Sequence, residues 1–131
     1  MPVIYSIDYE KKIIRTTCTE PIDEYEVTRH FEELENDNTC PEKLDVLLDL
    51  SKIKSIPEAF QLRTISNKII NFTKIQFRNC AIVTSSNVMY GMFRMFAVFV
   101  EKRFQVIEVF RNYSEAEFWL MQRNNATPIT P

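Results

Sequence analysis

The sequence contains little glycine and little histidine, and these absences exclude several kinds of site. Gly91 is the only glycine among the 131 residues. A phosphate-binding P-loop and a dinucleotide-binding fingerprint each need several glycines, so this chain can form neither of them. His30 is the only histidine, and no cysteine or aspartate stands near it at the spacing of metal ligands. We therefore predict no metal site and no cofactor, and expect His30 to be a partly exposed structural residue.

The chain also lacks a cluster of positive charge and a long apolar run. Its 16 lysines and arginines are interspersed with 18 acidic residues, which argues against nucleic acid as a partner. The longest mostly apolar stretch, 88–100, is shorter than the roughly 20 residues of a membrane-spanning helix. Three widely spaced cysteines, Cys18, Cys40 and Cys80, are typical of reduced thiols. With no secretion signal in the first residues, we expect a cytoplasmic protein without a membrane span.

The residues that are present suit one folded domain. A chain of 131 residues with 45% hydrophobic and 26% charged residues has the size and composition of a single globular unit. We place this domain at 1–123. The remaining segment, 124–131, is polar and contains two prolines, so we expect a frayed tail there.

The residue pattern predicts alternating strands and helices. Runs of β-branched and apolar residues predict the strands, which lie at 3–8, 12–19, 44–50, 80–84 and 104–110. Apolar residues at helical spacing predict the helices, which lie at about 22–38, 57–72, 88–102 and 114–122. Pro57 suits a first helical turn, and Ser114 with Glu117 forms the pattern of a capping box. This order predicts an α/β fold with a mostly parallel five-stranded sheet, an N-terminal antiparallel hairpin and four helices.

Several segments together carry a family resemblance. The most specific ones lie between 80 and 120, and are Ala81-Ile82-Val83, Tyr90-Gly91-Met92-Phe93-Arg94-Met95-Phe96, Val109-Phe110-Arg111 and Glu115-Ala116-Glu117-Phe118-Trp119-Leu120. Weaker support comes from 4–19 and from Leu47-Leu48-Asp49-Leu50-Ser51. In these segments the chain resembles the STAS-like (SpoIIAA-like) family, in its uncharacterised STAS/SEC14-like branch. The resemblance implies a right-handed β-α superhelix and a non-catalytic binding or regulatory module.

One feature of that family does not carry over. The resemblance implies a phosphorylatable serine, preceded by an aspartate, at the start of the second helix. Counted forward from Asp49-Leu50-Ser51, that position falls on Pro57-Glu58. Glu58 already places a fixed negative charge where a phosphate would interact with the helix dipole. We therefore do not predict a phosphorylation switch.

Polar residues that follow the predicted strands form a candidate binding site. Ligands of open parallel sheets bind beyond the carboxyl ends of the strands. The candidate residues in that region are Ser51, Lys52, Ser85, Ser86, Asn87, Tyr90 and Arg94. Free helix N–H groups near the serines would bind an anion or a partner's carboxylate. The alternatives are that the serines only cap the following helix and that Tyr90 and Arg94 form a surface cation–π pair.

The predicted helix at 88–102 is apolar around most of its circumference, so only part of it can face one sheet. We predict that Met89, Met92, Phe93 and Phe96 form an interface, because large exposed apolar patches mark interaction sites. The alternative is that these residues belong to the ordinary core.

Three functions are compatible with the sequence. The first is a non-catalytic module, acting as a homodimer, that binds a protein partner or an acidic small ligand. The second is a carrier or sensor of an apolar, lipid-like or anionic ligand, which the SEC14-like resemblance and the many Phe and Met residues favour. The third is an enzyme that uses Asp45 and Asp49 with Lys52 or Arg94. We rank it last, since the sequence shows no acid–base pair in a pocket, and identify no catalytic residue.

Overall fold

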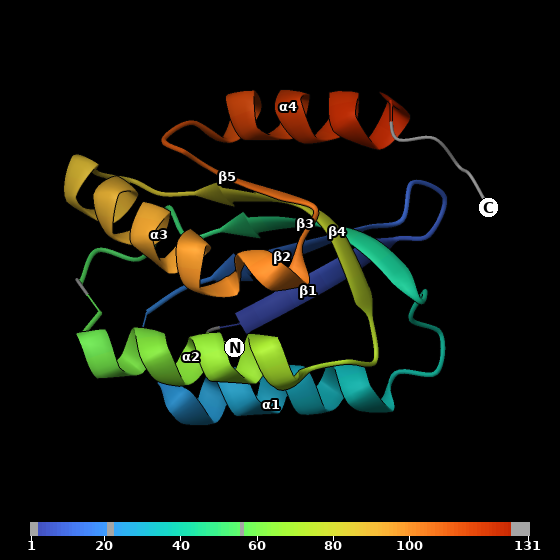
Figure 1. Cartoon of the computed structure of the whole chain (residues 1–131), viewed down its shortest axis with the longest axis horizontal. Coiled ribbons are helices and arrows are strands. Elements are labelled where there is room, and N and C mark those ends of the chain that lie inside the picture. The colour runs from blue at the N-terminus through green and yellow to red at the C-terminus, as the bar shows by residue number, and fades with distance from the viewer. Residues whose placement is uncertain (1–2, 21–22, 56, 127–131) are drawn as a thin grey trace.

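A computed structural model of the chain describes residues 3–20, 23–55 and 57–126, which form a sheet between two layers of helices (Figure 1). The strands are β1 (Val3–Asp8), β2 (Ile13–Cys18), β3 (Lys43–Asp49), β4 (Gln76–Val83) and β5 (Val106–Phe110). The helices are α1 (Glu24–Asn36), α2 (Ala59–Asn71), α3 (Asn87–Val100) and α4 (Tyr113–Ala126), with a short 3-10 helix at Glu101–Arg103. Among the described residues, no helix has the length and apolarity needed to span a membrane.

The five strands lie in the order of the sequence, β1-β2-β3-β4-β5. β1 and β2 pair as an antiparallel hairpin, and all other pairs are parallel. This arrangement confirms the predicted mostly parallel sheet with four helices. In the centre of the sheet, Leu48 of β3 pairs with Thr16 of β2 on one side and Ile82 of β4 on the other.

The helices are divided unevenly between the two faces of the sheet. α1, α2 and α3 lie on one face, and α4 alone covers the other (Figure 1). The strands advance in one direction while α1, α2 and α3 return on the same face, so the three parallel crossovers share one hand. Such connections are right-handed in nearly all proteins.

Side chains at the helix starts fix where the helices begin. Ser86 accepts a hydrogen bond from the N–H of Met89 at 3.2 Å, which supports the interpretation of this serine as the cap of α3. Asn112 accepts one from the N–H of Glu115 at 3.0 Å and caps α4. The predicted capping box at Ser114 is therefore wrong, because α4 begins one residue before that serine.

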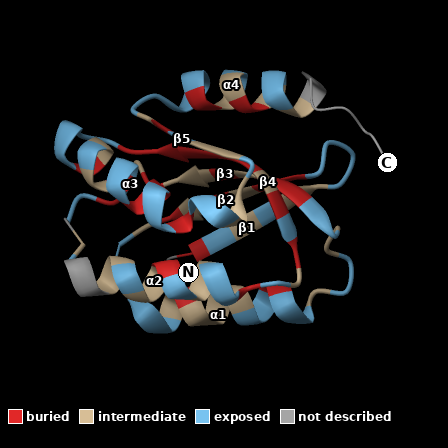
Figure 2. Cartoon of the chain, in the orientation of Figure 1, coloured by how far each residue is buried: buried red, intermediate tan, exposed pale blue. Residues whose placement is uncertain are grey.

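The α4 face of the sheet is closely packed. Six residues from β2, β3, β4 and α4 form its core, namely Ile13, Leu47, Ala81, Val83, Ala116 and Leu120, each with at most 1% of its surface exposed. Figure 2 shows buried residues along the side of α4 that faces the sheet. Dense packing of this kind is typical of native interiors.

A buried polar cluster holds the last turns of α4 on this face. Asp45 is fully buried, and its Oδ1 accepts a hydrogen bond from the N–H of Asn79 at 2.9 Å. Its Oδ2 accepts one from Nδ2 of Asn124 at 2.6 Å. α4 therefore continues through 124–126, the first part of the predicted tail. The rest of that tail, 127–131, lies outside the described residues.

Candidate functional site

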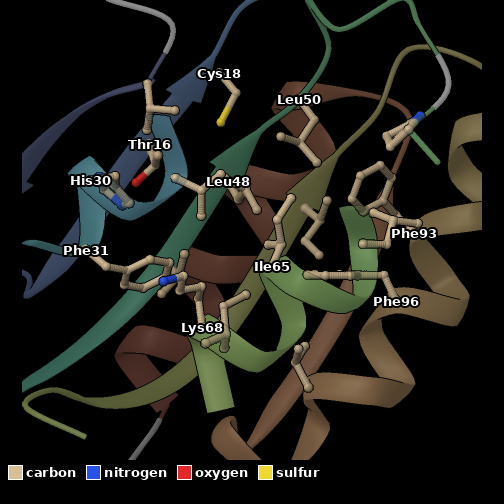
Figure 3. Close-up of a pocket in the computed structure, with 18 of the residues that line it drawn as sticks. Thr16, Cys18, His30, Phe31, Leu48, Leu50, Ile65, Lys68, Phe93 and Phe96 are labelled. Atoms are coloured by element: carbon tan, nitrogen blue, oxygen red, sulfur yellow. The ribbon is translucent and has the colours of Figure 1, made fainter. Parts of the chain in front are cut away.

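A cavity of about 810 Å³ lies between the other face of the sheet and the three helices α1, α2 and α3. Known ligand pockets span roughly 300 to 1,000 Å³. Most of its walls are apolar side chains from strands β2, β3 and β4 and from all three helices (Figure 3). Among them are Ile14, Val46, Leu48, Ile82, Leu62, Ile65, Ile69, Phe93 and Phe96.

The central strand β3 shows how differently its two faces are packed. Leu47 points to α4 and is 1% exposed. Its neighbours Val46 and Leu48 point to the cavity and are only partly buried. A packed protein interior has few voids larger than a water molecule, so helices that pack directly on a central strand bury its side chains completely. The helix layer on this face therefore stands away from the middle of the sheet.

Contacts lie at both ends of the helix layer formed by α1 and α2. At one end a chain of aromatic rings crosses from helix to sheet: the ring centroids of Phe31 and Phe72 are 5.1 Å apart, and those of Phe72 and Phe77 are 6.1 Å apart. At the other end the carboxylate of Glu20 accepts hydrogen bonds from the N–H groups of Lys54, at 2.8 Å, and Ser55. The cavity lies between these two attachments.

Surface residues contribute to the lining of the cavity in two regions. Near the starts of α1 and α2 its lining includes the exposed acidic residues Glu20, Asp23 and Glu24. Between α1 and α2, Phe31 and Lys68 line both the cavity and a shallow groove on the outer side of the two helices. A molecule would therefore reach the interior past acidic side chains near the helix starts, or past Lys68 with Glu32 and Glu35 between α1 and α2.

The inner wall carries few polar side chains, and those at its β2 and α1 side are uncharged at neutral pH. Burial, with a smaller effect of Arg29, lowers the pKa of His30 to about 4. Burial, with a smaller effect of Asp49, raises the pKa of the Cys18 thiol to about 12. Thr16 is 4% exposed and cannot ionise. This part of the cavity therefore offers hydrogen-bonding groups and no charge.

The residues predicted to form a site at the carboxyl ends of the strands do lie there. Two of the serines, however, already form hydrogen bonds within the loops at this end of the sheet. Ser51 donates from Oγ to Oδ1 of Asp49 at 2.6 Å, and Ser85 lies 3.5 Å from the carbonyl oxygen of Ile53. Lys52 is exposed. Ligand binding by these residues stays a prediction, because their present hydrogen bonds account for the loop conformations.

Tyr90 and Arg94 form the cation–π pair that was the alternative to a binding site, with the guanidinium carbon 5.8 Å from the ring centroid. Arg111 lies closer, at 4.6 Å from the same ring, and also donates a hydrogen bond to Oδ1 of Asn87. The sequence prediction did not include Arg111. Arg111 follows β5, whose end lies beside the end of β4 in the parallel sheet. The predicted parallel pairing of these two strands was therefore the signal that could have identified Arg111.

The predicted interface on α3 is wrong for three of its four residues. Met89, Phe93 and Phe96 are 2%, 7% and 3% exposed, and belong to the core between α3 and the sheet. Their spacing places them on one side of the helix, which turns toward the sheet, and Phe93 and Phe96 also line the cavity. Met92 is partly buried. The exposed apolar residues of α3 are instead Val88, Met95, Val98 and Phe99.

The carboxylates of the enzyme hypothesis do not face the cavity. Asp45 is enclosed under α4 by its bonds to Asn79 and Asn124. Asp49 accepts hydrogen bonds from the N–H and the hydroxyl of Ser51. Both residues therefore have structural partners.

Sequence reasoning missed the cavity and the polar side chains on its inner wall. Thr16, Cys18 and His30 come from β2 and α1, where single residues of these types are ordinary. Comparison with known proteins adds no further signal, since no protein-family model matches the chain and no curated protein matches it.

Proposed function

We propose that this chain is a non-catalytic binding module that carries or senses a small, largely apolar molecule in the cavity between the sheet and the helices α1, α2 and α3. The observation that carries the proposal is the cavity of about 810 Å³, which leaves Val46 and Leu48 of the central strand only partly buried. A ligand there would remove this apolar surface from water, which is the main favourable term in binding.

The chemistry of the cavity favours binding over catalysis. General acid–base catalysis needs groups that can exchange protons near neutral pH. Burial lowers the pKa of His30 to about 4 and raises that of Cys18 to about 12, so neither group changes charge in that range. The resemblance to the STAS/SEC14-like branch supports the same function, and membership of that family is part of the proposal.

Saturable binding of an apolar fluorescent dye tests the proposal. We expect N-phenyl-1-naphthylamine to gain fluorescence with the wild-type protein and to saturate at one molecule per chain. Leu48→Trp should weaken dye binding by narrowing the middle of the cavity, whereas Val98→Trp, on the exposed side of α3, should leave it unchanged. Circular dichroism would check that both variants fold. Absence of saturable dye binding in the folded wild-type protein would remove the proposal.

A second candidate function is self-association through α3. The apolar residues Val88, Met92, Met95 and Phe99 follow one another at helical spacing along one side, and three of them are at least 58% exposed. A stripe of this kind suits packing against a second copy of the same helix. This is the homodimer expected from the sequence, with Met92 as the one residue common to the expected interface and this stripe.

Light scattering coupled to size exclusion would test the dimer. We expect a dimer for the wild type, a monomer for Phe99→Glu, and a dimer for Phe118→Glu, which changes an equally exposed phenylalanine on α4. Phe93→Glu is a poor choice, since it would place a charge in the core. A wild-type monomer at every concentration tested would contradict this second function.

A further inference from the structure

Two polar side chains meet on one wall of the cavity without hydrogen-bond partners of their own. Figure 3 shows the hydroxyl of Thr16, from β2, and the imidazole of His30, from α1, pointing toward one another beside the cavity. Within the described part of the chain, the Thr16 hydroxyl makes no hydrogen bond, although the residue is only 4% exposed. The Nδ1 atom of His30 is buried and also without a partner. Buried polar groups in native proteins nearly always have partners, so the Thr16 hydroxyl at the cavity wall points to a ligand.

The burial of Nδ1 indicates which atom of His30 would meet a ligand. Since Nδ1 is closed off, the ring nitrogen left to face the cavity is Nε2. A proton on Nε2 avoids leaving an unpaired N–H at the closed position, so His30 acts as a donor through Nε2. The Thr16 hydroxyl can donate or accept. Together the two side chains suit one oxygen atom of a ligand.

The surroundings of this pair favour an uncharged oxygen. The imidazole of His30 is neutral, because burial lowers its pKa to about 4. Lys68 of α2 lies at the opening between α1 and α2, and the other opening carries Glu20 and Glu24. Among the described lining residues the positive charge comes from Lys68 of α2, whereas β2 and α1 supply none beside Thr16, so a carboxylate or phosphate bound at Thr16 would be buried at a large cost in free energy.

We infer that the ligand is an uncharged amphiphile, with an apolar body and one hydroxyl or carbonyl oxygen. That oxygen binds Thr16 and His30, and the apolar body extends past Leu48 and Ile65 toward Phe93 and Phe96 (Figure 3). This inference rests on the proposed function and specifies its substrate class.

Competition between two probes of equal chain length tests the inference. Dodecan-1-ol and dodecanoate would each displace N-phenyl-1-naphthylamine from the wild-type protein, at a pH where the acid is ionised. We expect the alcohol to bind at least about tenfold tighter, because only its oxygen can be buried at the Thr16 and His30 pair without a counter-charge.

Paired threonine variants locate the oxygen. Thr16→Val keeps the side-chain shape and removes the hydroxyl, so it should lower the affinity for dodecan-1-ol about fivefold to tenfold more than the affinity for the dye. Thr17→Val is the matched control, since the next residue of β2 points to the opposite face of the sheet, and it should change neither affinity. His30→Phe should lower the affinity for dodecan-1-ol to a similar extent.

The possible results separate this inference from the proposed function. Failure of the dye to bind would remove both. Dye binding together with dodecanoate as the equal or better competitor, or an unchanged alcohol affinity in Thr16→Val and His30→Phe, would overturn the inference and leave the proposed function standing. Loss of dodecanoate binding in Lys68→Met would then place the polar end of the ligand between α1 and α2.

Discussion

Two neighbouring leucines of β3 provide a direct test of the cavity. Leu47 points into the closely packed core under α4, whereas Leu48 points into the cavity on the opposite face. Both are leucines of the same central strand, so only their surroundings differ. We expect Leu47→Ala to destabilise the protein by about 2 kcal/mol more than Leu48→Ala.

The expected difference follows from the surroundings of each side chain. Truncation of a leucine in a packed core costs about 3 to 5 kcal/mol, through lost burial of the removed carbons and through the new cavity. Leu47, at 1% exposure, should show this full loss. Leu48 is only partly buried and already borders a large space. We therefore expect about 1 to 2 kcal/mol for Leu48→Ala, because the cavity contribution is largely absent.

Enlarging the same two side chains should reveal the opposite contrast. Leu47→Phe forces extra carbons into a packed core, which costs about 1 to 3 kcal/mol. Leu48→Phe has room in the cavity and should change the free energy of unfolding by less than about 0.5 kcal/mol, or stabilise the fold. This pair also controls for any general intolerance of β3 to substitution.

Urea denaturation of the four variants would measure these free energies. Trp119 is the only tryptophan, and its ring lies 5.5 Å from that of Phe110, so its fluorescence should report the loss of the α4 face. Far-ultraviolet circular dichroism would follow the helices in parallel, and coincident transitions would support two-state unfolding. Equal losses for Leu47→Ala and Leu48→Ala would refute the reasoning, since they would mean that the helices close onto the sheet in solution.

Two further predictions concern buried polar groups. Protonation of His30 occurs near pH 6.5 in the unfolded chain but only near pH 4 in the folded one, so the wild type should lose up to about 3 kcal/mol as the pH falls through that range. His30→Phe should not show this pH-dependent loss of unfolding free energy. If the stability of His30→Phe fell with pH as much as that of the wild type, the loss could not be attributed to His30. Asp45→Ala should lower the free energy of unfolding by at least about 2 kcal/mol, because it leaves the buried N–H of Asn79 without an acceptor. Asp49→Ala, at a partly exposed residue of the same strand, should cost clearly less, and equal costs in urea denaturation would count against the proposed role of Asp45.

The sequence alone determined the fold class of this protein. Short β-branched and apolar runs alternate with helically spaced ones, and local preference together with chain connectivity limits such an order to few arrangements. The mostly parallel pairing, the hairpin and the four helices agree with that expectation. Ends of elements were less well defined, as at α4, where Asn112 rather than Ser114 supplies the cap.

The orientation of α3 was decided only by the tertiary structure. Because apolar residues surround this helix, its own pattern does not specify which side faces the sheet. Packing places Met89, Phe93 and Phe96 inward and leaves Met95 and Phe99 exposed. The side of α3 that is buried depends on where the neighbouring strands and α2 lie. The local sequence of α3 contains no information about those positions.

The cavity likewise depends on contacts between residues that are distant in the sequence. Phe31 with Phe72 joins α1 to the end of α2, and Glu20 with Lys54 joins the two loops that precede these helices. Thr16 and His30 come from separate elements and meet only because α1 folds back over the hairpin of β1 and β2. A sequence specifies which residues prefer to be buried, but the space left between buried layers depends on how the layers pack, and so the candidate site emerged only from the assembled fold.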